Sequence, residues 1–260
     1  MWFGWDEQAR MTWSDDLIAC AGIVERGDPD RFVAAMAAPV TARAVLFPVY
    51  AFNVEVARAP FASAEPLIAE MRLQWWADAL DEIAAGGSVR RHEVATPLSG
   101  VLDGDGARIL GACIEARRRD ARREDIESVA ALRGYLSDTG GALMWGAARA
   151  LGSDQEARAR EVGTLSGLAN YLLAVPEFLA RGMRPLPEMT EQGYARFLEE
   201  MLRPGAPAAS RPQRIAELSA WRARGVVRRA LRDPAAVPEG RLVEAEFARR
   251  IGLFWRGLRV

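Results

Sequence analysis

The feature that most constrains this chain is helical periodicity in almost every segment. Between residues 39 and 58, apolar side chains recur at three- and four-residue steps, at Val45, Val49, Phe52 and Val56. The pattern continues through Pro48, so this proline is expected to kink the helix rather than end it. No run of β-branched residues alternates between turn signals as a strand does. The sequence therefore predicts an all-α fold, a single bundle of long helices.

End signals divide the rest of the chain into further helices. Ser63 is a plausible N-cap, Gly86-Gly87 a loop and DGDG at 103–106 a turn, while 152–154 should break and cap the chain. Gly140 and Gly141 are expected to allow close helix packing. The linker-like segment 203–212 should lie between two helices and lead to a C-terminal appendage. The expected helices cover about 63–83, 107–119 with helical pattern to 150, 155–181 and 241–258, and residues 1–260 are taken as one domain.

Composition excludes several classes of function. All 34 basic residues are Arg, and a chain without Lys cannot be a Schiff-base enzyme, a PLP enzyme or a Walker-type ATPase. The only histidine is His92, which excludes multi-histidine metal sites. The net charge of −1 gives no attraction to nucleic acid. Cys20 and Cys113 form no CxxC pair and suggest a reducing compartment. With no signal-peptide pattern and no run of 18 apolar residues, the chain is expected to be cytoplasmic and to span no membrane.

Titratable residues form no compact catalytic constellation. Between 115 and 125, acids such as Glu115 and Asp120 stand beside arginines, a pattern typical of a solvated, salt-bridged helix face. His92 falls in an expected loop and is interpreted as a bystander. Trp75 and Trp76 are adjacent and cannot share one helix face. One is expected in the core and the other at a groove or an interface, and core packing of both is the simpler alternative.

The order of motifs is more informative than any single residue. The segments are VYAFNVEVARAPF from Val49, RLQWWADAL from Arg72, IEARRRDA from Ile114, YLSDTGGALMWGAARALG from Tyr135 and VGTLSGLANYLLAVPEFLARGMRPLP from Val162. Over about 30–187 this order resembles the squalene/phytoene synthase family of head-to-head prenyl transferases. The last segment matches the family pattern without a gap. Retained family positions are Arg43, Tyr50, Asp120, Asn170, Glu177 and Arg181.

The resemblance implies an all-α cavity of the isoprenoid (trans-prenyl) synthase type that binds two prenyl diphosphates. In the family, two D-x-x-x-D motifs on facing helices hold Mg²⁺, because carboxylates at i and i+4 share one helix face. Here the four aspartate positions carry Ala57, Phe61, Ala174 and Phe178. We therefore expect no metal, no catalytic residue and no cofactor. Mg²⁺ would be expected only of an active enzyme.

Neighbouring positions depart from the family as well. Val54 and Leu173 stand where the family has arginines, and Glu55 is turned to a different helix face from Ala57. An apolar floor of this kind favours an apolar ligand or a filled cavity. We expect the floor to have been repacked into the core.

Two runs place the chain further within the family. AFNVEVAR at 51–58 and RLQWW at 72–76 resemble the mitochondrial complex I assembly factor 6 branch, whose acidic motifs are degraded. The first hypothesis is therefore a non-catalytic binding or assembly factor for respiratory complex I, with respiratory-complex subunits as partners. The alternatives are an active prenyl-diphosphate transferase that uses a different site, and a prenyl-lipid-binding protein that keeps the apolar tunnel.

Both chain ends carry aromatic and apolar residues. Trp2, Phe3 and Trp5 stand near the start, and Phe254 and Trp255 stand near the end among arginines. Either end could lie on a bilayer surface, which would make the chain peripheral on the inner membrane. The alternative is that terminal helices dock on the bundle.

Overall fold

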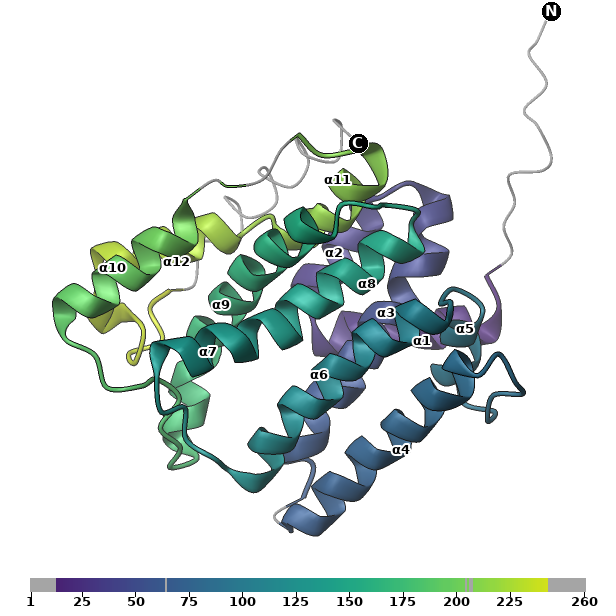
Figure 1. Ribbon diagram of the computed structural model, residues 1–260, viewed down its shortest axis with the longest axis horizontal. Coiled ribbons are helices and arrows are strands. Elements are labelled where there is room, and N and C mark those ends of the chain that lie inside the picture. The colour runs from purple at the N-terminus through teal and green to yellow at the C-terminus, as the bar shows by residue number, and fades with distance from the viewer. Residues whose placement is uncertain (1–12, 64, 204, 206–207, 243–260) are drawn as a thin grey trace, which may run out of the picture.

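The computed structural model describes residues 13–63, 65–203, 205 and 208–242, and all regular elements within them are helical (Figure 1). The all-α prediction is therefore confirmed. In chain order the α-helices are α1 (Asp15–Gly27), α2 (Pro29–Ala37), α3 (Val40–Arg58), α4 (Pro66–Ala84), α5 (Ala95–Ser99), α6 (Gly104–Arg122), α7 (Val129–Leu136), α8 (Ala142–Ala150), α9 (Glu156–Ala180), α10 (Glu191–Leu202), α11 (Arg211–Glu217) and α12 (Ala223–Arg232). The short helical turns are η2 (Ala59–Phe61), η3 (Ser137–Gly141), η4 (Leu218–Ala220) and η5 (Pro234–Ala236).

Helix α3 lies at the centre of the first half of the chain. It contacts α1, α2, α5, α6 and α8, and it continues through Pro48 as the apolar pattern predicts. Phe47 and Phe52 are fully buried on it. The ring of Phe47 packs against Trp13, and that of Phe52 packs edge-on against Trp76 of α4. The core therefore forms around one apolar helix, which fixes the face that carries Ala57 and Phe61.

Several helix ends differ from the predictions, because the backbone N–H groups there donate to other side chains than expected or to the expected side chain at another position. Helix α4 begins at Pro66 with Glu65 at the cap position, and Ser63, two residues before that cap, accepts a bond from the Glu65 N–H at 3.1 Å. DGDG is not a free turn, since Asp103 caps the Gly106 N–H at 2.7 Å and the following residues form the first turn of α6. That helix ends at Arg122, and the φ of 57° at Arg123, the residue after it, is left-handed. The expected continuous pattern to 150 is thereby broken.

The start of α9 and the first two helices also depart from the prediction. Gln155 occupies the cap position of α9, and Ser153 accepts a bond from its N–H at 3.2 Å. Helices α1 and α2 were not predicted. The signal for α2 was present, because Asp28 followed by Pro29 is an N-cap with proline at the first helical position.

Gly140 and Gly163 mark the closest approach of two helices. Gly140 lies in the π-helical turn η3, which packs against α9. A Cβ built on Gly163 would lie 2.4 Å from the Gly140 carbonyl oxygen, and one built on Gly140 would lie 2.5 Å from the Gly163 oxygen. Only residues without a side chain allow this contact. The packing interpretation of Gly140 is thus confirmed.

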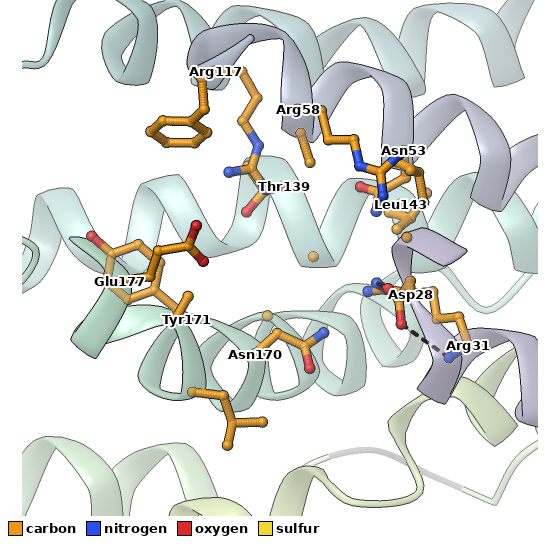
Figure 2. A pocket seen from close by; sticks show the side chains of 18 of the residues that line it. Asp28, Arg31, Asn53, Arg58, Arg117, Thr139, Leu143, Asn170, Tyr171 and Glu177 are labelled. Atoms are coloured by element: carbon orange, nitrogen blue, oxygen red, sulfur yellow. Dashed lines mark hydrogen bonds and ion pairs between the residues drawn. The ribbon is translucent and has the colours of Figure 1, made fainter. Parts of the chain in front are cut away.

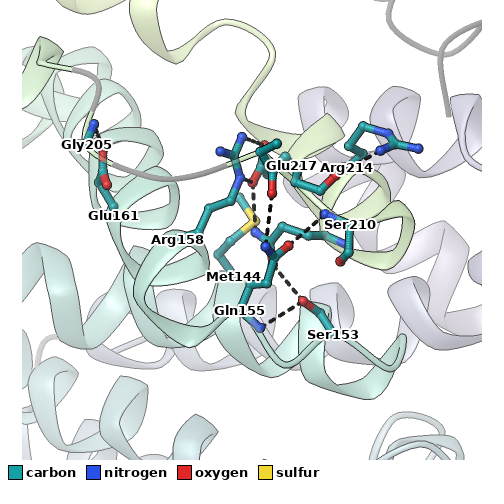
Figure 3. A network of polar contacts seen from close by, with 12 residues as sticks. Met144, Ser153, Gln155, Arg158, Glu161, Gly205, Ser210, Arg214 and Glu217 are labelled. Carbon is teal, nitrogen blue, oxygen red and sulfur yellow. Dashed lines mark hydrogen bonds and ion pairs between the residues drawn. The ribbon is translucent and has the colours of Figure 1, made fainter.

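The C-terminal helices are part of the bundle and not an appendage, so that expectation is wrong. Helix α12 packs on α9, and α11 packs on α8 and α9. A polar network fastens α11 to the start of α9 (Figure 3): Arg158 binds both carboxylate oxygens of Glu217, and Gln213 donates to the same carboxylate at 2.9 Å and accepts from Ser153. A helix does lie on each side of the linker, as predicted, although α11 begins inside the predicted segment, at Arg211.

Two stretches, Val40–Phe61 and Glu156–Ala180, are long and apolar enough to cross a membrane by length and composition alone, although neither holds an unbroken run of 18 apolar residues. Of their most apolar windows, 56% and 44% are buried within the bundle, and core helices pass the same test. The expected helix over 241–258 falls almost entirely outside the described residues, as do the terminal segments for which membrane contact was considered.

Candidate functional site

A cavity of about 740 Å³ lies between α3, α6, η3 and α9, and side chains from these elements surround it (Figure 2). The four degenerate motif positions all line it: Ala57, Phe61, Ala174 and Phe178. The rings of Phe61 and Phe178 lie 6.0 Å apart, and Tyr171 packs against Phe178 at 5.3 Å. The two replaced motifs thus meet as a small aromatic cluster at one part of the cavity wall.

This wall is not part of the core. Ala57, Phe61, Ala174 and Phe178 are all partly exposed, whereas Val54 beside them is buried. The expectation that the floor was repacked into the core is therefore wrong. The physical reason is that two phenyl rings fill far less volume than the space between α3 and α9, so the cavity stays open.

The charges that line the cavity are largely neutralised by local pairs. Arg31 forms an ion pair with Asp28, and Arg181 binds Glu177 at 2.6 Å. The Arg181 guanidinium also lies 4.6 Å from the centre of the Phe61 ring, a cation–π contact. Arg58 has no ion pair within the described residues.

Arg117 and Asp120, both partly buried, form a polar triad with the buried Tyr135 beside the cavity. Arg117 donates to the Tyr135 hydroxyl at 2.6 Å and to Asp120 at 3.0 Å, and the hydroxyl donates to Asp120 at 2.6 Å. Burial works against the charge of Arg117, but Tyr135 and Asp120 outweigh it and raise its pKa. Burial raises the pKa of Tyr135 far above its ordinary value, so the phenol keeps its proton. The interpretation of this helix face as solvated is wrong for Arg117 and Asp120.

The retained family positions have different surroundings. Asn170, Glu177 and Arg181 line the cavity, and Asp120 reaches it through Arg117. Arg43 donates to the Ala38 and Met36 carbonyl oxygens at the end of α2. Tyr50 is buried in the core. Any role of these six residues in binding stays a prediction.

Sequence reasoning missed several residues that line the cavity. Asp28 and Arg31 reach it from the start of α2, and Thr139 and Gly140 reach it from the π-helical turn. Asp28 could have been found from its N-cap signature with Pro29. The π-helical turn had no sequence signal beyond the paired glycines.

The residues present do not fit the Mg²⁺ cluster that the family resemblance implies. Within the described parts of the chain, no group of three or more His, Cys, Asp or Glu side chains could hold a metal ion. The acids at the cavity, Asp28, Glu177 and Asp120, are each bound to an arginine. Hard cations need several free oxygen ligands, and the Arg58 charge opposes them. The arrangement can bind an apolar molecule and contact an anionic group, but it cannot neutralise a leaving diphosphate through metal.

Fold and cavity together define the class of protein: an all-α bundle of the isoprenoid synthase type, with Ala57, Phe61, Ala174 and Phe178 in the wall of its central cavity. A sequence model of the squalene/phytoene synthase family matches residues 24–252, and the chain belongs to that family.

Individual relatives agree with this assignment. The chain is 30% identical over 168 residues to the Drosophila melanogaster protein named NADH dehydrogenase (ubiquinone) complex I, assembly factor 6 homolog, over 60% of this chain and 50% of that protein. It thus spans about half the length of that curated relative. A dehydrosqualene synthase in complex with ligand has a TM-score of 0.62 at 15% identity, covering 94% of this chain and 96% of that one. Squalene synthase HpnC from Alicyclobacillus acidocaldarius has a TM-score of 0.56 at 19% identity, covering 94% and 92%. At these identities the two structures show a shared fold alone.

Proposed function

We propose that this protein is a non-catalytic member of the squalene/phytoene synthase family that acts by binding, as an assembly factor for respiratory complex I. The observation that carries the proposal is the composition of the cavity wall. All four metal-motif positions are apolar, yet the scaffold that presents them is intact. Loss of the ligands with retention of the fold is what a binding role allows and a metal-dependent ionisation does not.

The relative named a complex I assembly factor 6 homolog supports the choice of partner. Its identity with this chain extends over 168 residues, well beyond the two short runs that first suggested the branch. The partners would be subunits of the respiratory complex. The location predicted from the sequence, cytoplasmic and peripheral on the inner membrane, fits such a partner and stays a prediction.

A lipid-binding function is the second candidate, and one observation favours it. The cavity is about 740 Å³ and open to solvent, although Phe61 and Phe178 could have closed it. A space of this size has aromatic walls and the Arg58 guanidinium, which forms no ion pair with a described residue, and it suits an apolar molecule with an anionic end. The third candidate, an active prenyl transferase, has only the fold in its favour.

Affinity purification from the native host tests the proposal. The tagged chain should co-purify subunits of NADH:ubiquinone oxidoreductase from membranes, in excess over a tagged helical bundle of unrelated family expressed at the same level. A purification that yields no such subunit, and instead yields a bound prenyl lipid, would move the lipid-binding function ahead.

A further inference from the structure

A second hollow lies on the outside of the bundle, between α3 and α4, where Figure 1 shows α4 at the edge of the molecule. Its volume is about 540 Å³. The lining residues that matter here are Glu55, Arg58, Arg72, Trp75, Trp76 and His92. We call this hollow the α3–α4 groove. It shares Arg58 and Ala62 with the central cavity, and its other lining residues are different.

Two sequence runs converge on this groove. AFNVEVAR at 51–58 supplies Glu55 and Arg58, and RLQWW at 72–76 supplies Arg72 and both tryptophans. Both runs are singled out by the sequence alone, independently of their positions in space. Arg72, Trp75 and Trp76 do not line the central cavity. That cavity therefore gives the RLQWW run no role in binding.

The floor of the groove is aromatic and held in place. The rings of Trp75 and Trp76 lie 4.8 Å apart and nearly perpendicular, and the His92 ring lies 4.8 Å from Trp75. Trp75 also stacks on Arg90, whose guanidinium lies 5.0 Å from the ring centre and is bound to Glu82 at 2.6 Å. Side chains locked in this way lose little freedom on binding, which favours affinity.

The groove offers hydrogen-bond donors in excess of acceptors. The His92 Nδ1 accepts from the Val94 N–H at 3.1 Å, so the neutral ring carries its proton on Nε2 and can donate there. Arg58 and Arg72 form no ion pair with any described residue. Two guanidinium groups and one imidazole N–H outnumber the single acid, Glu55. Such a set suits a carboxylate.

An exposed apolar stripe on α4 leads into the groove. Leu67, Met71 and Trp75 follow one another at i, i+4 spacing and so share a face of the helix. Leu67 is 70% exposed and Met71 is 65% exposed, whereas the opposite face buries Ala69, Leu73 and Trp76. Large apolar side chains gathered on one exposed face mark an interaction surface. A small carboxylate would fill the groove but leave this stripe uncovered.

We infer that the α3–α4 groove and the α4 stripe together bind a segment of a partner protein that carries a carboxylate next to an aromatic or branched apolar side chain. The apolar side chain covers Leu67 and Met71, and the carboxylate enters the groove beside Arg72. The site itself follows from its geometry, and only the identity of the partner as a complex I subunit rests on the proposed function.

A membrane surface is the competing occupant, and the charges oppose it. A helix face that binds anionic lipid is rimmed by Lys or Arg. Helix α4 carries Asp78 as well as Arg72, Glu65 stands at its N-cap, and Trp76 in the groove is only 4% exposed. A recess with mixed charge fits a protein segment better.

The test is a selection from a phage-displayed library of random 12-residue peptides on the full-length protein, which does not depend on the identity of the partner. Arg72→Glu reverses an exposed charge that bonds to no described residue, and Met71→Glu places a charge on the exposed stripe. Arg196→Glu, on α10, is the control for charge reversal away from the groove; Arg196 is 81% exposed and pairs with Glu200 at 3.4 Å. Thermal melts establish that all three variants fold.

We expect the selected peptides to carry Asp or Glu next to an aromatic or branched apolar residue. Their binding should fall by roughly tenfold or more in Arg72→Glu and in Met71→Glu, and stay unchanged in Arg196→Glu. An empty selection, basic peptides, or equal binding to all variants would overturn the inference. The competing outcome is a protein that yields no peptide and co-sediments with phosphatidylcholine–phosphatidylglycerol vesicles. If Arg72→Glu abolishes that co-sedimentation, the face binds a membrane and the inference is overturned. If the peptides bind as expected but no complex I subunit co-purifies, the proposed function fails and the site stands.

Discussion

Replacing Gly163 by alanine should test how closely α9 approaches the π-helical turn η3. The new Cβ would lie 2.4 Å from the Gly140 carbonyl oxygen, 2.6 Å from the Met144 Cβ and 2.9 Å from the Gly141 Cα. None of these atoms is the far end of a flexible side chain, so relief requires the two elements to move apart. Overpacking a core lowers the free energy of unfolding by about 1–3 kcal/mol. We expect a value near 3 kcal/mol here, because two of the three nearest atoms belong to the backbone.

Gly111→Ala is the matched control, because its Cβ would meet nothing within 4 Å in the middle of α6. Alanine in place of a helical glycine stabilises by about 1 kcal/mol, and this gain applies at both sites. The net expectation is a loss of about 2 kcal/mol for Gly163→Ala and a gain of about 1 kcal/mol for Gly111→Ala. In a chain of this size the melting temperature should fall by roughly 4–8 °C and rise by roughly 2–4 °C, respectively. Far-ultraviolet circular dichroism melts measure both. A Gly163→Ala protein that melts at or above the parent would refute the close approach.

Three further outcomes are expected. Burial raises the pKa of Cys20 and Cys113 to about 12, so neither thiol should react with Ellman's reagent at pH 8 in the folded protein, and both should react in denaturant; rapid reaction before unfolding would contradict their burial. Asp120→Ala should destabilise by about 2 kcal/mol in a urea titration, less than for a fully buried pair because the Arg117 side chain is 18% exposed. Asp105→Ala, whose ion pairs are exposed, should cost under about 1 kcal/mol; equal costs would show that the triad adds no stability beyond a surface pair. Purified protein should release no pyrophosphate from farnesyl or geranylgeranyl diphosphate in the presence of Mg²⁺, and Mg²⁺-dependent release would show that the cavity is catalytic.

The bundle could be predicted from the sequence because the apolar periodicity of α3 is long enough to continue on both sides of a helix breaker. Pro48 illustrates this, since the spacing on both sides of it outweighs the lost hydrogen bond. Helix ends were predicted less well. Ser63 and Asp103 are both good capping residues, but which of two neighbouring N–H groups they serve depends on how the next turn packs.

Some features of the cavity could be predicted from the sequence and others could not. Ala57 and Phe178 could be located because motif spacing fixes a helix face, and that face proved to line one cavity. Whether the cavity was open could not be read from the sequence, since it depends on the distance between α3 and α9. Arg117 seemed an ordinary charge in a run of arginines, and only the approach of Tyr135 from another helix makes it part of a polar triad. Hydrogen bonds between side chains of distant segments cannot be predicted from the local sequence pattern.

The central claim, assembly by binding without metal chemistry, is tested most directly by deletion and complementation in the native host. Assembled NADH:ubiquinone oxidoreductase is quantified on blue native gels with in-gel activity. We predict that the complex falls when the gene is deleted and is restored equally by the wild-type chain and by Glu177→Gln, which removes the acid remaining beside Phe178. An unchanged level of the complex in the deletion strain, or rescue by the wild type but not by Glu177→Gln, would contradict this claim.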